Sequence, residues 1–266
     1  MWRYIVERTK NGEFNWVDLL ARDLEGQSKF YEALFGWVRT DVPLGEGMIY
    51  RMFKADGHTV AGAAGLSPDQ MQQGRPSTWN TYLAVDDIDA TVAKAAALGA
   101  TVIMPPDNVP GDSGRIAVIQ DPTGAYVSFW KPQRYDESME YRMPGQLSWN
   151  DLATRDPEKA ADFYSKLLGW VVKPLPGGAV PYWEIYIDGQ GEGGIMPMPE
   201  MVPPEVPAYW LVYFGSADLP ATVAKAVSLG ATVLSEPVTV PDMVAFAVLA
   251  DPAGAAFALM QPLMAV

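Results

Sequence analysis

Two carboxylates stand beside tryptophans in a pattern that could support chemistry. Asp18 follows Trp16 by two residues, and Asp151 follows Trp149 by two. In an extended strand, residues two apart point to the same side of a sheet, so each carboxylate would lie beside an indole ring. That pair suits a flat apolar ligand with one hydrogen-bond donor. By excluding water, the indole could also raise the proton affinity of the carboxylate and make it a base near neutrality.

Other reactive side chains are scarce. The chain has no cysteine and one histidine, His58. The lack of cysteine excludes disulfides, thiolate catalysis and cysteine-held zinc or iron–sulfur centres. His58 follows the turn signal Asp56-Gly57, which favours a surface position over a catalytic one.

The two Trp-x-Asp motifs belong to a tandem duplication. FNWVDLLARDLEGQSKFYEALFGW, from Phe14, returns as LSWNDLATRDPEKAADFYSKLLGW, from Leu147. ATVAKAAALGATV, from Ala90, returns as ATVAKAVSLGATV, from Ala221. A period this long is too large for a solenoid repeat and predicts two domains, 1–134 and 135–266, joined by a linker within 131–145.

The sequence of each half predicts strands and helices in the same order. Residues 15–21 alternate as a strand, Asp23 is a helix N-cap, and Asp56-Gly57 marks a hairpin. A further strand at 78–85, an alanine-rich helix ending at Gly99 and a hairpin closed by Asp121-Pro-Thr-Gly complete the half. We therefore predict an α+β fold with two βαβββ units per half, four in all, in curved mixed sheets with helices on the outer face.

These motifs resemble the vicinal oxygen chelate superfamily, which includes glyoxalase I, bleomycin resistance proteins and extradiol dioxygenases. The resemblance rests on a strand, then Asp-x-x-x-x-x-x-Phe-Tyr, then Leu-Phe-Gly-Trp or Leu-Leu-Gly-Trp, and finally Asp-Pro-x-Gly before a last strand. It covers both halves. The tandem form with Trp-x-Asp-Leu resembles actinobacterial proteins described as hydroxylases or glyoxalase-like antigens.

The resemblance implies one divalent metal held in the cup of each sheet by His, Glu or Gln side chains. The corresponding positions are Trp16, Asn80 and Ser128 in the first half, and Trp149, Leu211 and Ala258 in the second. All six depart from the ligand types that zinc, iron or nickel favour. We therefore expect no metal and no cofactor, and a cup partly refilled with aromatic rings.

Strand alternation adds further cup residues. They are Tyr82, Tyr126 and Trp130 in the first half and Tyr213 in the second. The first half keeps more polar groups, so it is the favoured site if only one cup functions. Arg115 follows the loop Pro110–Gly114 and is expected either as a solvated loop residue or as an anion clamp over the cup.

Structural roles are weighed beside the functional ones. Trp16 and Trp149 could simply fill space, and Asp18 and Asp151 could pair with Arg22 and Arg155 or with backbone donors. The proline- and methionine-rich loops 66–77 and 197–207 are expected to be lids over the cups or connectors between domains.

Three functions remain open from sequence. The first is a binding protein that holds a small apolar or aromatic molecule in a metal-free cup. The second is a lyase, isomerase or cyclase in which Asp18 is the general base and Tyr82 or Arg115 stabilises an oxyanion. The third is a divalent-metal enzyme, of lyase or dioxygenase type, with carboxylate ligands from Asp18, Asp151 or Glu184. The expected ligand-binding residues are Trp16, Asn80, Tyr126, Ser128, Trp130, Trp149, Asp151, Glu184 and Tyr213.

Charge limits the partners. The formal net charge of −13 argues against nucleic acid and anionic membranes, leaving a small-molecule ligand as the expected partner. The first residues carry charges that interrupt any apolar run, so we expect neither a secretion signal nor a membrane span, and a cytoplasmic location. Two modules in one chain predict a monomer with an internal pseudo-dimer, or a weak homodimer.

Overall fold

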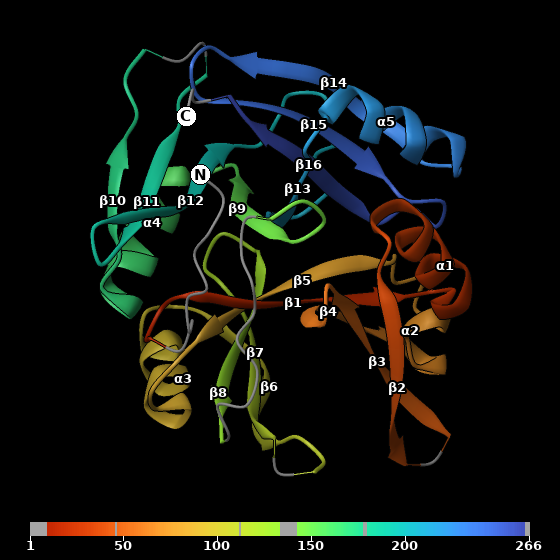
Figure 1. The fold of residues 1–266 in the computed structure, drawn as a ribbon. Coiled ribbons are helices and arrows are strands. Elements are labelled where there is room, and N and C mark those ends of the chain that lie inside the picture. Colours follow the sequence, from red (N-terminus) through yellow and green to blue (C-terminus); the bar gives the residue numbers. More distant parts are fainter. Residues whose placement is uncertain (1–9, 46, 112, 134–142, 178–179, 264–266) are drawn as a thin grey trace.

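The fold consists of two eight-stranded sheets, one from each half of the chain (Figure 1). The computed structural model describes residues 10–45, 47–111, 113–133, 143–177 and 180–263. The first sheet has the order β2-β3-β4-β1-β5-β8-β7-β6, and the second repeats it as β10-β11-β12-β9-β13-β16-β15-β14. The α+β fold with tandem βαβββ units is therefore confirmed. The predicted domain boundary at 134/135 lies outside the described residues.

The elements of the first half are β1 (Phe14–Ala21), α1 (Leu24–Phe35), β2 (Val38–Gly45), β3 (Met48–Ala55), β4 (His58–Gly65), α2 (Pro68–Gln72), β5 (Thr78–Ala84), α3 (Ile88–Ala97), β6 (Thr101–Asn108), β7 (Gly114–Gln120) and β8 (Tyr126–Pro132). Those of the second half are β9 (Leu147–Thr154), α4 (Pro157–Leu168), β10 (Val171–Pro174), β11 (Trp183–Ile187), β12 (Gln190–Pro197), β13 (Tyr209–Gly215), α5 (Leu219–Ser228), β14 (Thr232–Val240), β15 (Val244–Ala250) and β16 (Ala256–Pro262).

Local signals set the helix that follows the first strand of each half. The Asp23 side chain accepts a hydrogen bond from the backbone N–H of Gly26, and Asp156 accepts one from Lys159, as N-caps do. Both helices end at a glycine in the left-handed conformation, Gly36 at φ 74° and Gly169 at φ 78°. The predicted N-cap at Asp23 is thus confirmed.

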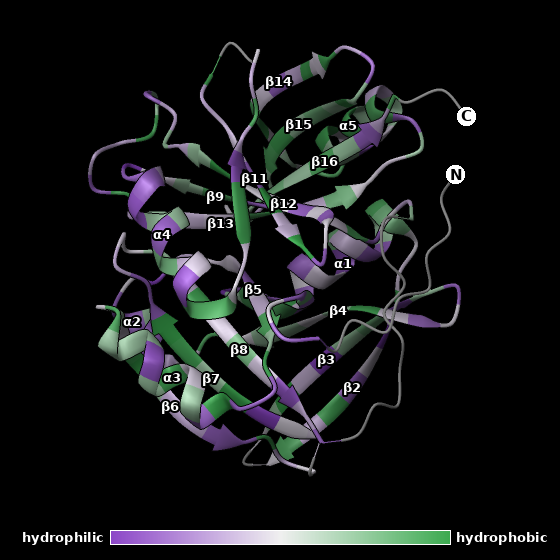
Figure 2. Ribbon diagram, turned by 90° about the vertical axis from the view of Figure 1, so that its left-hand side faces the viewer, coloured by the Kyte–Doolittle hydropathy of each residue, from purple (hydrophilic) through white to green (hydrophobic). Residues whose placement is uncertain are grey.

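One hydrophobic core joins the two halves. Phe14 of the first half packs against Trp170 and Trp210 of the second, each with ring centroids 5.4 Å away. Helix α1 lies beside α5, and α3 lies beside α4 (Figure 1). These helices carry hydrophobic and hydrophilic residues together, as expected when one helix face is buried (Figure 2). The helix-bearing faces of both sheets therefore share one core.

Two reciprocal hydrogen bonds tie the halves together at this core. The Tyr31 hydroxyl donates to Asp251 over 3.0 Å, and the Tyr164 hydroxyl donates to Asp121 over 2.9 Å. Asp121 and Asp251 also accept backbone N–H groups within their own Asp-Pro-x-Gly turns. Each turn is thus a contact between the halves as well as a hairpin closure.

The face of each sheet that is turned away from this shared core is called here the first cup (β1–β8) or the second cup (β9–β16). On β1, Val17 and Leu19 enter the shared core, whereas Trp16 and Asp18 project to the first cup. No helix among the described residues is long and apolar enough to cross a membrane.

Candidate functional site

The central residue of the first cup is Asp18, which lies in the middle of its sheet. Strand β1 pairs with β4 on one side and with β5 on the other, placing Gly62 and Asn80 opposite Asp18. The Asp18 side chain is almost fully buried, with 3% of its surface exposed. A carboxylate removed from water in this way must find hydrogen-bond donors within the protein.

Three side chains provide those donors. The Tyr82 hydroxyl donates to Oδ2 of Asp18 over 2.6 Å, and the Tyr50 hydroxyl donates to the same oxygen over 3.2 Å. The Asn80 amide donates to Oδ1 over 2.9 Å. Trp16 extends the network, because its indole N–H donates to the Tyr50 hydroxyl over 2.8 Å. The alternative in which Asp18 pairs with Arg22 is wrong, since Arg22 donates to the Arg75 carbonyl.

The second cup repeats this cluster around Asp151. The hydroxyls of Tyr213 and Tyr182 donate to opposite oxygens of Asp151, each over 2.7 Å. The Trp149 indole N–H lies 3.0 Å from Asp151 and 2.9 Å from the Tyr182 hydroxyl. Leu211 stands where the first cup has Asn80, so the second carboxylate lacks an amide donor at that position. Arg155 is bonded to the carbonyls of Pro203 and Val206, so its expected pairing with Asp151 is also wrong.

Tyr50 and Tyr182 were not predicted as site residues. They stand at equivalent places in the two halves, as do Gly62 and Gly194 on the next strand. A Cβ added to Gly62 would lie 2.0 Å from the Tyr50 hydroxyl, and one on Gly194 would lie 1.9 Å from the Tyr182 hydroxyl. Each glycine thus leaves the space through which a tyrosine reaches the aspartate. The duplicated tyrosine–glycine pair was the signal in the sequence.

Burial sets the electrostatics of both clusters. It raises the pKa of Asp18 and of Asp151 above the ordinary range, although the tyrosine hydrogen bonds act in the opposite direction. Burial, with the nearby carboxylate as the second cause, raises the pKa of Tyr50, Tyr82, Tyr182 and Tyr213 far above that of a free tyrosine. The phenols therefore stay protonated and donate hydrogen bonds to the aspartates.

This direction of donation decides what the cups can bind. A tyrosine that donates to a carboxylate keeps oxygen lone pairs that can accept a hydrogen bond. The O–H groups of Tyr82 and Tyr213 are engaged with Asp18 and Asp151; the Tyr82 oxygen also accepts a hydrogen bond from Ser128. A ligand with a donor group fits this arrangement, whereas an oxyanion does not.

The other predicted residues of the first cup lie on its face, except one. On β8, Val127 and Phe129 enter the core, which leaves Tyr126, Ser128 and Trp130 on the cup side. Ser128 is hydrogen-bonded to Tyr82. Tyr126 is 40% exposed, with the Arg75 guanidinium 5.8 Å from its ring centroid. Arg75 brings the loop 66–77 to this edge of the first cup.

Arg115 is the exception. It shares a strand face with Ala117 and Ile119, two core residues on the helix-bearing side of the sheet. Its guanidinium is paired with Asp89 at the start of α3. Of the two alternatives for Arg115, the one that placed it as an anion clamp over the cup is therefore wrong.

Glu184 lies on the second cup. It shares a face of β11 with Tyr186, and its Oε2 accepts a hydrogen bond from the Tyr186 hydroxyl over 2.6 Å. Its neighbours Ile185 and Ile187 enter the core. Glu184 is half-buried and stands opposite Gly194, as Met52 stands opposite Gly62 in the first cup.

The donor set does not fit the metal that the fold family implies. Trp16, Asn80 and Ser128 are all engaged in the Asp18 network, and Leu211 and Ala258 belong to an apolar cluster. Within the described parts of the chain, no group of three or more His, Cys, Asp or Glu residues could hold a metal ion. Asp18 and Asp151, two of the carboxylates considered as ligands, lie on different sheets.

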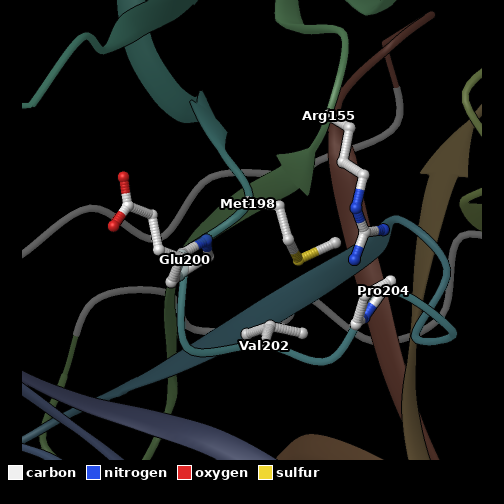
Figure 3. Close-up of a pocket in the computed structure, with 6 residues that line it drawn as sticks. Arg155, Met198, Glu200, Val202 and Pro204 are labelled. Carbon is white, nitrogen blue, oxygen red and sulfur yellow. The ribbon is translucent and has the colours of Figure 1, made fainter.

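An open depression of about 230 Å³ lies away from the cup residues, beside the loop 197–207. Its lining includes Arg155, Met198, Glu200, Val202 and Pro204 (Figure 3). The Met198 side chain extends toward Arg155, whereas the Glu200 carboxylate points away (Figure 3). Arg155 is bound to the loop carbonyls, so this depression has a structural explanation and no converging reactive groups.

Comparison with known proteins places both halves in one family. Residues 13–129 match the model of the glyoxalase/bleomycin resistance protein/dioxygenase superfamily, and residues 150–260 match that of a glyoxalase-like domain. CFP32 of Mycobacterium tuberculosis, whose name assigns it provisionally to the glyoxylases, is 40% identical over 95% of this chain and 96% of its own. The anthracycline biosynthesis protein DnrV of Streptomyces peucetius is 34% identical over 92% of each chain.

Solved structures share the fold at low identity. The Mn(II)-bound glyoxalase from Novosphingobium aromaticivorans superposes with a TM-score of 0.67 at 16% identity, over 95% of this chain and 82% of that one. The 2,2',3-trihydroxybiphenyl 1,2-dioxygenase of Sphingomonas wittichii gives 0.66 at 14% identity, over 95% and 91%. At these identities the likeness shows the arrangement of strands and helices and leaves the chemistry open.

Proposed function

Starting from the fact that this chain belongs to the glyoxalase/bleomycin resistance protein/dioxygenase superfamily, we propose that it binds a planar aromatic molecule with a hydrogen-bond donor, without a metal. One observation carries the proposal. In the first cup, Trp16, Asn80 and Ser128 occupy the three positions where the fold family places metal ligands. Their side chains instead belong to the hydrogen-bond network around Asp18 and Tyr82.

The chemistry of the clusters supports this ligand class. Each cup holds a tryptophan beside two tyrosines that donate hydrogen bonds to a buried aspartate. The rings offer flat apolar contacts, and the tyrosine oxygens accept a donor such as a phenol hydroxyl. DnrV, named for anthracycline biosynthesis, would handle molecules of this kind, because anthracyclines are planar hydroxylated aromatics.

The catalytic alternatives have less support. An oxyanion would need donors, but the Tyr82 hydroxyl is engaged with Asp18 and Arg115 lies on the other face of the sheet. As a base, Asp18 would have to exchange its proton through a tyrosine, because it is almost fully buried. Binding is therefore the function that the geometry favours.

Tryptophan fluorescence can test the proposal, because Trp16 and Trp149 lie in the two clusters. The protein is titrated with 2-hydroxyanthraquinone and with 2-methoxyanthraquinone, which has the same rings but no donor. We expect saturable quenching by the hydroxyl compound and binding of the methoxy compound weaker by about fivefold or more. Equal affinities would remove the hydrogen-bond part of the proposal, and absence of binding would refute it.

The same fold predicts how the chain assembles. The two sheets already pack through a shared core, so the paired arrangement is complete within one chain. We therefore propose a monomer. Light scattering after gel filtration should give a mass near 29.0 kDa, and a stable mass of twice that value would contradict this.

A further inference from the structure

The two cups differ in a way that separates their roles. On β13 and β16, residues facing the second cup form an apolar cluster around Leu211, Tyr213 and Ala258. Half-buried side chains extend that cluster over the cup: Trp149, Tyr209, Phe246, Val248, Ala256 and Met260. In the first cup, the polar residues Asn80 and Ser128 stand where Leu211 and Ala258 stand in the second. The floor of the second cup is thus more apolar than that of the first cup.

A second carboxylate borders this floor. If Gly191 carried a Cβ, that atom would lie 2.2 Å from Oε1 of Glu184 and 3.6 Å from Cη2 of Trp149. The missing side chain therefore leaves a space in which the carboxylate and the edge of the indole come together. The equivalent first-cup residues are Thr59 in place of Gly191 and Met52 in place of Glu184.

The lysine opposite Glu184 on the neighbouring strand is engaged with another residue. Lys173 stands opposite Glu184 on β10, but its ammonium lies over the Tyr186 ring, 5.1 Å from the centroid. The Tyr186 hydroxyl binds Oε2 of Glu184, so it also fixes the carboxylate. With Asp151 buried beneath the same cup, the apolar floor carries two carboxylates at its centre and edge.

The geometry points to the second cup as the ligand site and to Glu184 as its specificity residue for a planar aromatic with a cationic nitrogen. The rings would lie on the apolar floor. The cation would contact the Glu184 carboxylate, which attracts it as the opposite charge. This inference rests on the proposed function, and it names the cup and the charge that the proposal leaves open.

A pair of fluorescent probes tests the inference on the full chain. At neutral pH, 9-(aminomethyl)anthracene is cationic, whereas 9-anthracenemethanol has the same rings and a neutral donor. Binding is followed by fluorescence anisotropy. We expect the amine to bind about fivefold or more tightly than the alcohol, and Glu184→Gln to remove that preference while leaving alcohol binding within about twofold.

Matched variants assign the cup. Met52→Gln makes the equivalent change in the first cup and should leave both affinities unchanged. Tyr209→Thr puts the first-cup residue on the second-cup floor and should weaken both probes without affecting a buried core position.

The outcomes separate this inference from the proposed function. If the alcohol binds but the amine has no advantage, or if Met52→Gln rather than Glu184→Gln removes it, the inference is overturned and the proposed function stands. If Tyr209→Thr weakens neither probe, the second cup is not the site. If neither probe binds the wild-type protein, both are overturned.

Discussion

The Tyr82 hydroxyl lies 2.6 Å from a carboxylate oxygen of Asp18 and donates a hydrogen bond to it, and Tyr213 stands in the same relation to Asp151. These two contacts make the aspartates hydrogen-bond acceptors that are already occupied by the protein. Because each tyrosine uses its O–H group as a donor to the aspartate, its oxygen can act toward a ligand only as a hydrogen-bond acceptor.

Removing a tyrosine hydroxyl from either cluster should destabilise the fold. Tyr82→Phe leaves the buried Asp18 carboxylate with one donor fewer, and Tyr213→Phe does the same to Asp151. We expect each variant to lower the free energy of unfolding by about 1–3 kcal/mol, measured by urea denaturation. Tyr126→Phe is the control, because Tyr126 is 40% exposed and no change beyond about 0.5 kcal/mol is expected there. Equal stabilities for Tyr82→Phe and the control would show that the Asp18 contact contributes little.

The raised pKa of Asp18 predicts a specific pH dependence. Because burial raises the pKa of folded Asp18 above its unfolded value, the folded state holds the proton more tightly. The corresponding stability is fully present below the unfolded pKa and is lost as pH rises through the folded pKa. Asp18→Asn removes this titration, so wild type should lose stability relative to Asp18→Asn as pH rises from about 4, the ordinary pKa of an aspartate. Thermal unfolding of both proteins across this range measures the difference, and a difference that grows in favour of wild type would contradict the assignment.

Contacts between the halves predict cooperative unfolding. Tyr31→Phe removes the hydrogen bond to Asp251, and Tyr164→Phe removes the one to Asp121. Each change should cost about 1–3 kcal/mol, because a buried aspartate loses a donor. Both halves should still unfold in one transition, since the core is continuous. Calorimetry that resolves two separate transitions in the wild-type protein would contradict this view.

Arg115 should be dispensable for binding. It is paired with Asp89 on the helix-bearing face, so Arg115→Ala leaves both cups unchanged. We expect the affinity for 2-hydroxyanthraquinone to equal that of wild type in the same titration. A large loss of affinity in Arg115→Ala, with normal thermal stability, would mean that this side chain reaches the ligand by another route.

The sequence alone predicted much of this arrangement, and the reasons for its failures are physical. Strand alternation placed Trp16 and Asp18 on one face correctly, because Val17 and Leu19 had to enter the core. The same alternation applies to Arg115. It lies two residues before Ala117 and therefore on the same, core-facing side of β7, but the prediction relied on the glycine-rich loop that precedes it.

Long-range contacts were harder to predict. Tyr50 reaches Asp18 across β4 only because Gly62 leaves space, a relation that depends on strand register rather than on spacing along the chain. The preference for the first cup followed its polar residues, whereas the continuous apolar floor of the second cup becomes visible only when β13, β15 and β16 are placed together. Glu184 was predicted as a ligand-binding residue. The approach of its carboxylate and the Trp149 ring to Gly191 depends on the register of three strands and could not be predicted from the sequence.

Calorimetric binding to metal-free protein tests the central claim most directly. The protein is treated with a chelator until elemental analysis finds less than about a tenth of an equivalent of metal per chain, and is then titrated with 2-hydroxyanthraquinone. We predict saturable binding with the same affinity before and after chelation, and no gain when divalent ions are returned. Binding that disappears on chelation and returns with one equivalent of a divalent ion would contradict the account.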